Sequence, residues 1–143
     1  MTAPTPGRVR PDGDLFLAEL LRAALPGVTV VNLIDTEALK RLPLVAVRVV
    51  SPGSFDQTRN VRMRYPIGVD VEAWAEERRA ASDLDDRVLG AFLRAQELGT
   101  KAGGAYASRF AIDSPGAELR TASQPGRLHR WSASYSFTLR PAS

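Results

Sequence analysis

Apolar residues in the first part of the chain follow the period of a helix. Between residues 14 and 25 they recur at steps of three and four and fall on one wide face. Asp12 or Asp14 suits the N-cap, because a carboxylate there accepts a hydrogen bond from a free backbone N–H, and Pro26-Gly27 ends the helix. The pattern predicts an amphipathic helix whose apolar face consists of Phe16, Leu17, Leu20, Leu21, Ala24 and Leu25.

Two runs of β-branched residues follow this helix. Residues 28–34 (VTVVNLI) and 44–50 (LVAVRVV) predict strands, and residues 35–41 between them predict a turn or one short helical turn. The second run is apolar almost without interruption, which predicts that the strand is buried on both faces.

The third predicted strand alternates between apolar and polar positions. One face is formed by Val69, Val71, Ala73 and Ala75, and the other by Asp70, Glu72 and Trp74. Pro66 lacks an N–H, so we expect it at a bulge, at a sheet edge or at the start of this strand. Residues 51–59 are rich in turn formers, and we expect residues 51–66 to form an arm that extends beyond the sheet.

The second half of the chain predicts one helix and two strands. Residues 76–98 have an apolar stripe of helical period, and Gly99 suits the C-terminal cap. Residues 105–112 predict a strand, and residues 113–130, with two Pro-Gly pairs, predict a long loop. Residues 131–139 alternate between an apolar face and a face of hydroxyl groups. The helical stripe consists of Ala81, Leu84, Val88, Ala91 and Ala95, widened by Leu89, Phe92 and Leu93.

These elements predict an α+β fold. Strands joined by hairpins pair antiparallel, and amphipathic helices bury their apolar faces on a sheet. We expect a two-layer sandwich, with a mainly antiparallel sheet and two helices on one face, in the order α-β-β-β-α-β-β. Residues 1–13 lack an apolar period and predict a flexible N-terminal arm, which leaves residues 14–143 as a single domain.

Composition narrows the classes of function. The net charge is +3, and all 19 basic residues except Lys40 and Lys101 are arginines. A GC-rich gene is the simplest explanation, although arginine also suits protein interfaces because its planar group holds a carboxylate by two hydrogen bonds. Acidic residues are interleaved with the basic ones, which argues against a dedicated nucleic-acid binder. The absence of cysteine excludes disulfides and thiolate chemistry.

The sequence predicts neither a membrane span nor a secretory signal. No apolar run approaches the roughly 20 residues that cross a bilayer, and the first residues are rich in Pro, Gly, Thr and Arg. We therefore expect a protein made in a cytoplasm, without membrane partners.

No group of residues predicts catalysis. His129 is the single histidine and lies in a polar stretch without a nucleophile or further metal ligands close in sequence, so we expect an ordinary surface histidine. Asp83, Asp85 and Asp86 lie near the start of a helix, where a solvated face is the expected environment. Gly103-Gly104 follows a helix and precedes a strand, the wrong order for a phosphate loop. We expect no catalytic residue, cofactor or metal, and a protein that is not an enzyme.

A basic patch and one tryptophan are candidates for binding. Arg62 and Arg64 share a strand face on the expected arm, with Arg59 and Tyr65 nearby. The patch could bind nucleic acid, an acidic protein neighbour or only solvent, and the single aromatic residue favours a protein neighbour. Trp74 lies on the polar face of its strand, where it marks an interface or is covered by a loop or by the first helix.

Three segments, in order, resemble one family. The segment VDVEAWAEERRAASDLDDRVLGAFL (69–93) is a strand followed at once by an Ala- and acid-rich helix. The opening helix ends in Leu-Pro-Gly-Val and leads into a valine-rich strand, and the closing strand is RWSASYSFTLR (130–140). Together these patterns, spread over residues 12–140, resemble the tail terminator, or tail completion, proteins of long-tailed bacteriophages.

The resemblance implies a structural role in the virion. It implies a ring of six subunits that stops growth of the tail tube at its head-proximal end and joins the tube to head–tail connector proteins, with DNA only passing through the lumen. It assigns no particular residue, since interface residues of the family are not fixed in type. We expect neighbour contacts from the N-terminal segment, the arm and the long loop. The individual candidates are Phe55, Arg59, Arg62, Arg64, Tyr65, Trp74, Arg120 and Arg127.

Two other functions fit the sequence less well. A head–tail connector or neck protein would also form a ring. A small nucleic-acid-binding module would use the arginines of the arm and would bind with a steep dependence on salt.

Overall fold

The computed structural model describes residues 11–51, 64–120 and 127–142. Its elements follow the predicted order of helix, three strands, helix and two strands, so the predicted α+β fold is confirmed. The elements are α1 (Gly13–Ala24), β1 (Thr29–Val31), the 3-10 helix η1 (Ala38–Lys40), β2 (Leu44–Ser51), β3 (Tyr65–Ala75), α2 (Arg78–Leu98), β4 (Ala105–Glu118) and β5 (His129–Pro141).

The described strands form one five-stranded sheet in the order β1-β2-β3-β5-β4. All neighbouring pairs are antiparallel except β1 and β2, which are parallel. The connection between β1 and β2 contains η1 and brings the chain back to the same end of the sheet, as a parallel pair requires. The long pair β3–β5 lies at the centre, from Tyr65 opposite Leu139 to Ala75 opposite His129.

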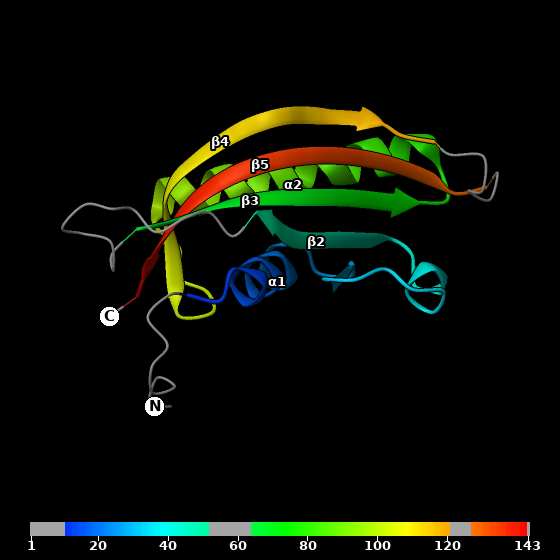
Figure 1. Ribbon diagram of the computed structural model, residues 1–143. Coiled ribbons are helices and arrows are strands. Elements are labelled where there is room, and N and C mark those ends of the chain that lie inside the picture. The colour runs from blue at the N-terminus through cyan, green and yellow to red at the C-terminus, as the bar shows by residue number, and fades with distance from the viewer. Residues whose placement is uncertain (1–10, 52–63, 121–126, 143) are drawn as a thin grey trace.

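Both helices pack on one face of this sheet (Figure 1). The core between the layers contains the buried residues of α1, the buried stripe of α2 and the apolar face of β2, β3 and β5. Phe92 lies edge-on to Phe137 at 4.9 Å and to Tyr135 at 5.4 Å between ring centroids. Edge-to-face pairs of this kind contribute roughly 0.5–1.5 kcal/mol each beyond burial.

The helix ends are fixed by the predicted capping residues. Asp12 Oδ1 accepts a hydrogen bond from the Leu15 N–H at 3.1 Å. Gly99 has a φ of +63°, the left-handed conformation that glycine adopts at low cost, and it ends α2. Glu77 has extended backbone and occupies the N-cap position of α2 without a capping hydrogen bond from its side chain. The helix therefore begins at Arg78, two residues later than the expected Glu76.

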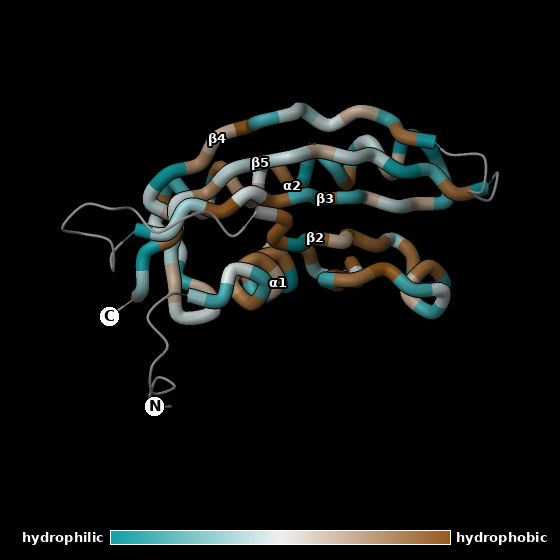
Figure 2. The backbone as a smooth tube through the Cα atoms, in the orientation of Figure 1, coloured by the Kyte–Doolittle hydropathy of each residue, from teal (hydrophilic) through white to brown (hydrophobic). Residues whose placement is uncertain are grey.

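The two faces of β5 differ as predicted. Ala133, Tyr135, Phe137 and Leu139 are buried, whereas the serines and Trp131 are only partly covered. In Figure 2, β5 is of intermediate hydropathy along most of its length, whereas β2 is more hydrophobic. The first four residues of β2 are buried on both faces, but Arg48 and Val50 are exposed, so the prediction of two buried faces holds for half of that strand.

The predicted loop over residues 113–130 is wrong at both ends. β4 continues to Glu118, and β5 begins at His129. The pairing of β4 with β5 shifts register between Ile112 and Ser114 and again between Ser114 and Ala117. These irregularities accommodate Pro115 and Gly116 within an edge strand, where a missing N–H is tolerated.

The predicted arm over residues 51–66 is also too long. Ser51 belongs to β2, while Tyr65 and Pro66 begin β3 and pair with Leu139 and Thr138. Pro66 therefore lies at the start of its strand, one of the positions expected for it. The rest of the expected arm, residues 52–63, lies outside the described residues.

Candidate interaction surfaces

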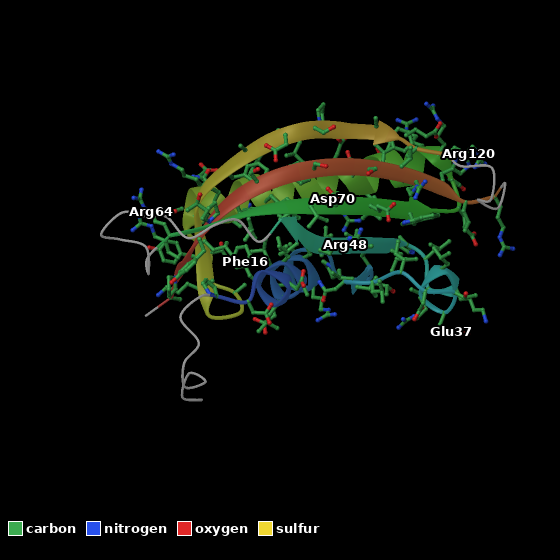
Figure 3. The ribbon with its side chains drawn as sticks, in the orientation of Figure 1. Phe16, Glu37, Arg48, Arg64, Asp70 and Arg120 are labelled. Carbon is green, nitrogen blue, oxygen red and sulfur yellow. The ribbon has the colours of Figure 1, made fainter. Side chains whose placement is uncertain are left out.

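The face of the sheet opposite the helices is lined by polar side chains. Figure 3 shows Arg48 on β2 and Asp70 on β3 near the middle of the sheet. Arg48 lies opposite Asp70, and Asp70 lies opposite Ser134 of β5, so one polar row crosses three strands. Neither α1 nor α2 packs against this row, because both helices belong to the core on the other face.

Side chains on this face are held by one another. Ser134 Oγ donates to Asp70 Oδ1 at 2.9 Å, and Arg130 Nη1 donates to Glu72 Oε1 at 2.8 Å. The Arg130 side chain is 14% exposed and the Glu72 side chain 27%, so this ion pair is partly shielded from water. Pairs of this kind across neighbouring strands hold the polar side chains of this face in place.

A small apolar cluster interrupts the polar face at one end. Trp74 packs there with Ala38, Leu44 and Leu128, and it is only 6% exposed. The guanidinium carbon of Arg130 lies 5.1 Å from the Trp74 ring centroid. Trp74 was expected either to mark an interface or to be covered within the subunit. The structure shows that it is covered, and little of its surface remains for a partner.

A cavity of about 260 Å³ lies beside β1 on the same face. Asn32 lines it and donates from Nδ2 to the Val47 carbonyl at 2.8 Å, which fixes the end of β1 against β2. Leu33, at its rim, is 73% exposed. Arg48, Asp70 and Glu72 complete the lining, so the cavity offers charges of both signs and apolar surface.

Asp85 departs from the expected environment of the acidic cluster. The expectation of a solvated helical face is wrong for this residue, which is 6% exposed and faces β4. A side chain at Gly116 would overlap the Asp85 carboxylate, which would then have to shift. Asp85 Oδ1 has no hydrogen-bond partner among the described residues. Burial, and then the charge of Asp86, raise the pKa of Asp85 to about 6.

Tyr135 lies in the same electrostatic environment. Burial, then the charges of Asp85 and Asp86, raise the pKa of its hydroxyl to about 12. The sequence contained a signal for this buried carboxylate, because Asp85 continues the spacing of Ala81, Val88 and Phe92 along the apolar stripe. A stripe interrupted by one charged residue indicates a buried polar group.

The residues predicted for contacts do not gather on one surface. Arg64 and Arg120 lie at opposite ends of the sheet (Figure 3). Tyr65 is next to Arg64 but only 4% exposed, whereas Arg127 is exposed near the end of the β4–β5 hairpin. Arg120 Nη1 donates to the Leu128 carbonyl at 3.0 Å and ties the two sides of that hairpin together. Phe55, Arg59 and Arg62 lie outside the described residues.

His129 is part of a charged group at the start of β5. Its Nδ1 lies 3.8 Å from Glu118 Oε2, which also accepts a hydrogen bond from Arg78 Nε at 2.9 Å. Over the described residues, no cluster of three or more His, Asp or Glu side chains is arranged to hold a metal ion. Nor does any helix in this part of the chain have the length and apolar character needed to cross a membrane.

Comparison with known proteins leaves the family open. The chain matches no model of a protein family, and no curated protein is significantly similar to it.

Proposed function

We propose that this chain is a structural protein of a long-tailed bacteriophage, a tail terminator subunit. It assembles with copies of itself, in sixes, into a ring at the head-proximal end of the tail. The ring ends the growth of the tail tube and presents a surface to the head–tail connector proteins. DNA contacts it only during passage through the lumen.

The observation that supports this proposal most is where the three family-like segments lie. The opening segment forms α1 and the start of β1, the segment of residues 69–93 forms most of β3 and α2, and the closing segment forms β5. The whole of β3 pairs with β5. α2 packs on β5 through Phe92 and shares one apolar core with β3. Patterns far apart in the sequence therefore meet in one core, as expected if they belong to one family fold.

The polar environment supports a binding role over an enzymatic one. Ser134 on the open face donates to a carboxylate, and His129 is next to a carboxylate already bound by an arginine. A catalytic nucleophile needs a base that a third group orients. Among the described residues, no further side chain is bonded to Asp70, and His129 contacts a carboxylate and no hydroxyl group. We therefore propose that the protein acts through its surfaces and is not an enzyme.

Deletion of the gene from its phage tests the proposal. Negative-stain electron microscopy of the lysate should show tail tubes of irregular and excessive length, unattached to DNA-filled heads. Expression of the intact chain from a plasmid is the control and should restore tails of one length.

Other outcomes separate the alternatives. Tails of normal length beside detached, filled heads would favour a connector or neck protein. Intact, infectious particles would rule out a structural role and would direct attention to nucleic-acid binding by the arginines near residue 64, measured as the dependence of binding on salt.

A further inference from the structure

A groove runs between the two helices on their outer side. Small residues make up most of its lining, and its volume is about 610 Å³. Arg87 and Arg94 line it from α2 and are exposed. Neither arginine forms an ion pair or hydrogen bond with another described residue. Its apolar lining includes Leu20, Ala23 and Ala24 of α1 and Ala91 of α2.

The opposite flank of α2 has the complementary character. Arg78 contacts Glu118 of β4, and Asp85 faces Gly116 of β4, so the positions in line with them turn toward β4. Leu89 and Leu93 lie on that side by helical spacing. Leu93 and Ile112 of β4 are each 46% exposed. Phe110 of β4 contacts Phe92 of α2 and joins the two elements there. We call Leu89, Leu93, Phe110 and Ile112 the apolar flank, at the outer strand of the sheet.

The charge on this flank is opposite to that of the groove. Asp86 precedes Leu89 and Leu93 at steps of three and seven and is exposed. Like the two arginines, it forms no ion pair or hydrogen bond with another described residue. In Figure 1, α1 and β4 lie at opposite sides of the sheet, with α2 between them. One copy therefore has a basic apolar groove on one side and an acidic apolar flank on the other.

We infer that the groove of one copy binds the flank of the next. Leu93 and Ile112 fill the groove between α1 and α2 of the neighbour, and Asp86 pairs with Arg87 and Arg94. The contact joins two different surfaces, so it is head-to-tail, and contacts of this kind close into rings when the rotation between copies allows it. The inference rests on the proposed function, since it assigns the two sides of the ring subunit.

A second copy fits this groove for reasons of charge. Within the described part of the chain, the two arginines of the groove have no partner, and the Asp86 carboxylate on the flank has none either. Exposed leucine and isoleucine side chains belong to the same flank. Opposite charges across an interface fix its register and exclude like-charged alternatives. Two complementary surfaces on one chain need no further protein to build the ring.

Cysteine cross-linking tests this contact, because the native chain contains no cysteine. Ala23→Cys labels the groove, Leu93→Cys labels the flank, and a short bismaleimide reagent joins thiols that lie close together. Each single variant alone should stay monomeric on a denaturing gel. A mixture of the two should give dimers, and the double variant should give a ladder that stops at the size of the ring.

A matched control distinguishes a specific contact between copies from random encounters in solution. Arg41→Cys places an exposed thiol near η1, away from both surfaces, and the pair Ala23→Cys with Arg41→Cys should cross-link at least about tenfold less. Efficient cross-linking of Leu93→Cys to itself would overturn the head-to-tail contact in favour of a symmetric one. Yields equal to the Arg41 control would show that groove and flank do not meet.

Charge reversal provides a second measurement. In the chain that carries both Ala23→Cys and Leu93→Cys, the changes Arg87→Asp and Arg94→Asp together should lower the yield of the cross-linked ladder about tenfold. Adding Asp86→Arg to this chain should restore most of the yield, because the opposite charges then face each other again. No restoration would overturn the proposed pairing. If deletion of the gene gives overlong tails while both tests fail, the inference is wrong and the proposed function stands. Infectious particles from the phage that lacks the gene would instead contradict the proposed function itself.

Discussion

The two faces of the sheet are stabilised in different ways. Under the helices, packing dominates: Phe92, Tyr135 and Phe137 are fully enclosed and in ring contact, and Asp85 is the one buried charged group among the described residues. On the open face, hydrogen bonds and the ion pair of Arg130 with Glu72 join neighbouring strands, and apolar side chains gather around Trp74 and beside the cavity at β1. The covered face should therefore determine stability, while the open face can change in sequence at low cost.

The largest loss of stability should follow Phe92→Ala. Phe92 is 0% exposed and contacts three aromatic rings, so its removal leaves a cavity and should cost about 3–5 kcal/mol in the free energy of unfolding. Urea denaturation followed by circular dichroism measures this. Leu93→Ala, at the exposed next position, is the control and should cost less than about 1 kcal/mol. Equal losses for both variants would contradict the assignment of the core face.

The second largest change in the free energy of unfolding should come from the titration of Asp85 with pH. Its pKa is about 6 in the folded chain and 3.8 as a free side chain, so between these values the folded state keeps a proton that the unfolded state has lost. Stability should fall by up to about 3 kcal/mol as pH rises from about 4 to about 6. Asp85→Asn removes this titration and should flatten that part of the profile.

The exposed neighbour gives the control for this measurement. Asp83→Asn should leave the shape of the profile of unfolding free energy against pH unchanged. If the wild type and Asp85→Asn profiles run parallel between pH 4 and pH 6, the carboxylate of Asp85 is not held in a buried environment.

A smaller effect is expected on the open face from Glu72→Gln. The change removes the charge paired with Arg130 but keeps a hydrogen-bond acceptor. The pair is partly exposed, so the loss should be about 0.5–1 kcal/mol and should shrink in 1 M salt, where charges are screened. A loss above about 2 kcal/mol, insensitive to salt, would show that this face contributes as much as the core.

The smallest effect should come from Ser134→Ala. Asp70 loses one hydrogen bond but can still be hydrated, so the free energy of unfolding should fall by about 0.5 kcal/mol. Thermal unfolding compared with Ser132→Ala, a serine on the same face, measures the difference. A fall of several degrees in Tm for Ser134→Ala alone would indicate a more enclosed polar network than the structure has.

The sequence predicts the fold well where one face of an element is buried. The period of α1, the stripe of α2 and the alternation of β3 and β5 each follow from burial of one face, and the structure confirms these elements. Two predicted members of the buried faces are wrong, because Ala24 of α1 and Leu93 of α2 are exposed. Turn-forming residues gave a wrong prediction where pairing with a distant strand determined the structure. Pro115 and Gly116 indicate a loop, yet long pairing with β5 keeps them in β4 through shifts in register.

The candidate surfaces were harder to predict than the fold. Burial of Trp74 depends on η1 and Leu128, which are distant in sequence, and burial of Asp85 depends on Gly116 of β4. The groove between the helices could not be predicted, because it depends on how α1 and α2 are placed relative to each other, and no local sequence pattern determines that placement. Arg87, Arg94 and Asp86 have no ion-pair partner among residues 11–51, 64–120 and 127–142, and this can be known only from the structure.

The position of the protein in the virion tests the central claim most directly. A phage whose gene has a C-terminal epitope tag would be purified, labelled with antibody-bound gold and imaged by electron microscopy. We predict gold at a single place on each particle, where the tail meets the head. Gold along the tail tube, at its distal tip or on the capsid shell would contradict the proposed terminator role, as would unlabelled particles in a strain that expresses the tagged chain.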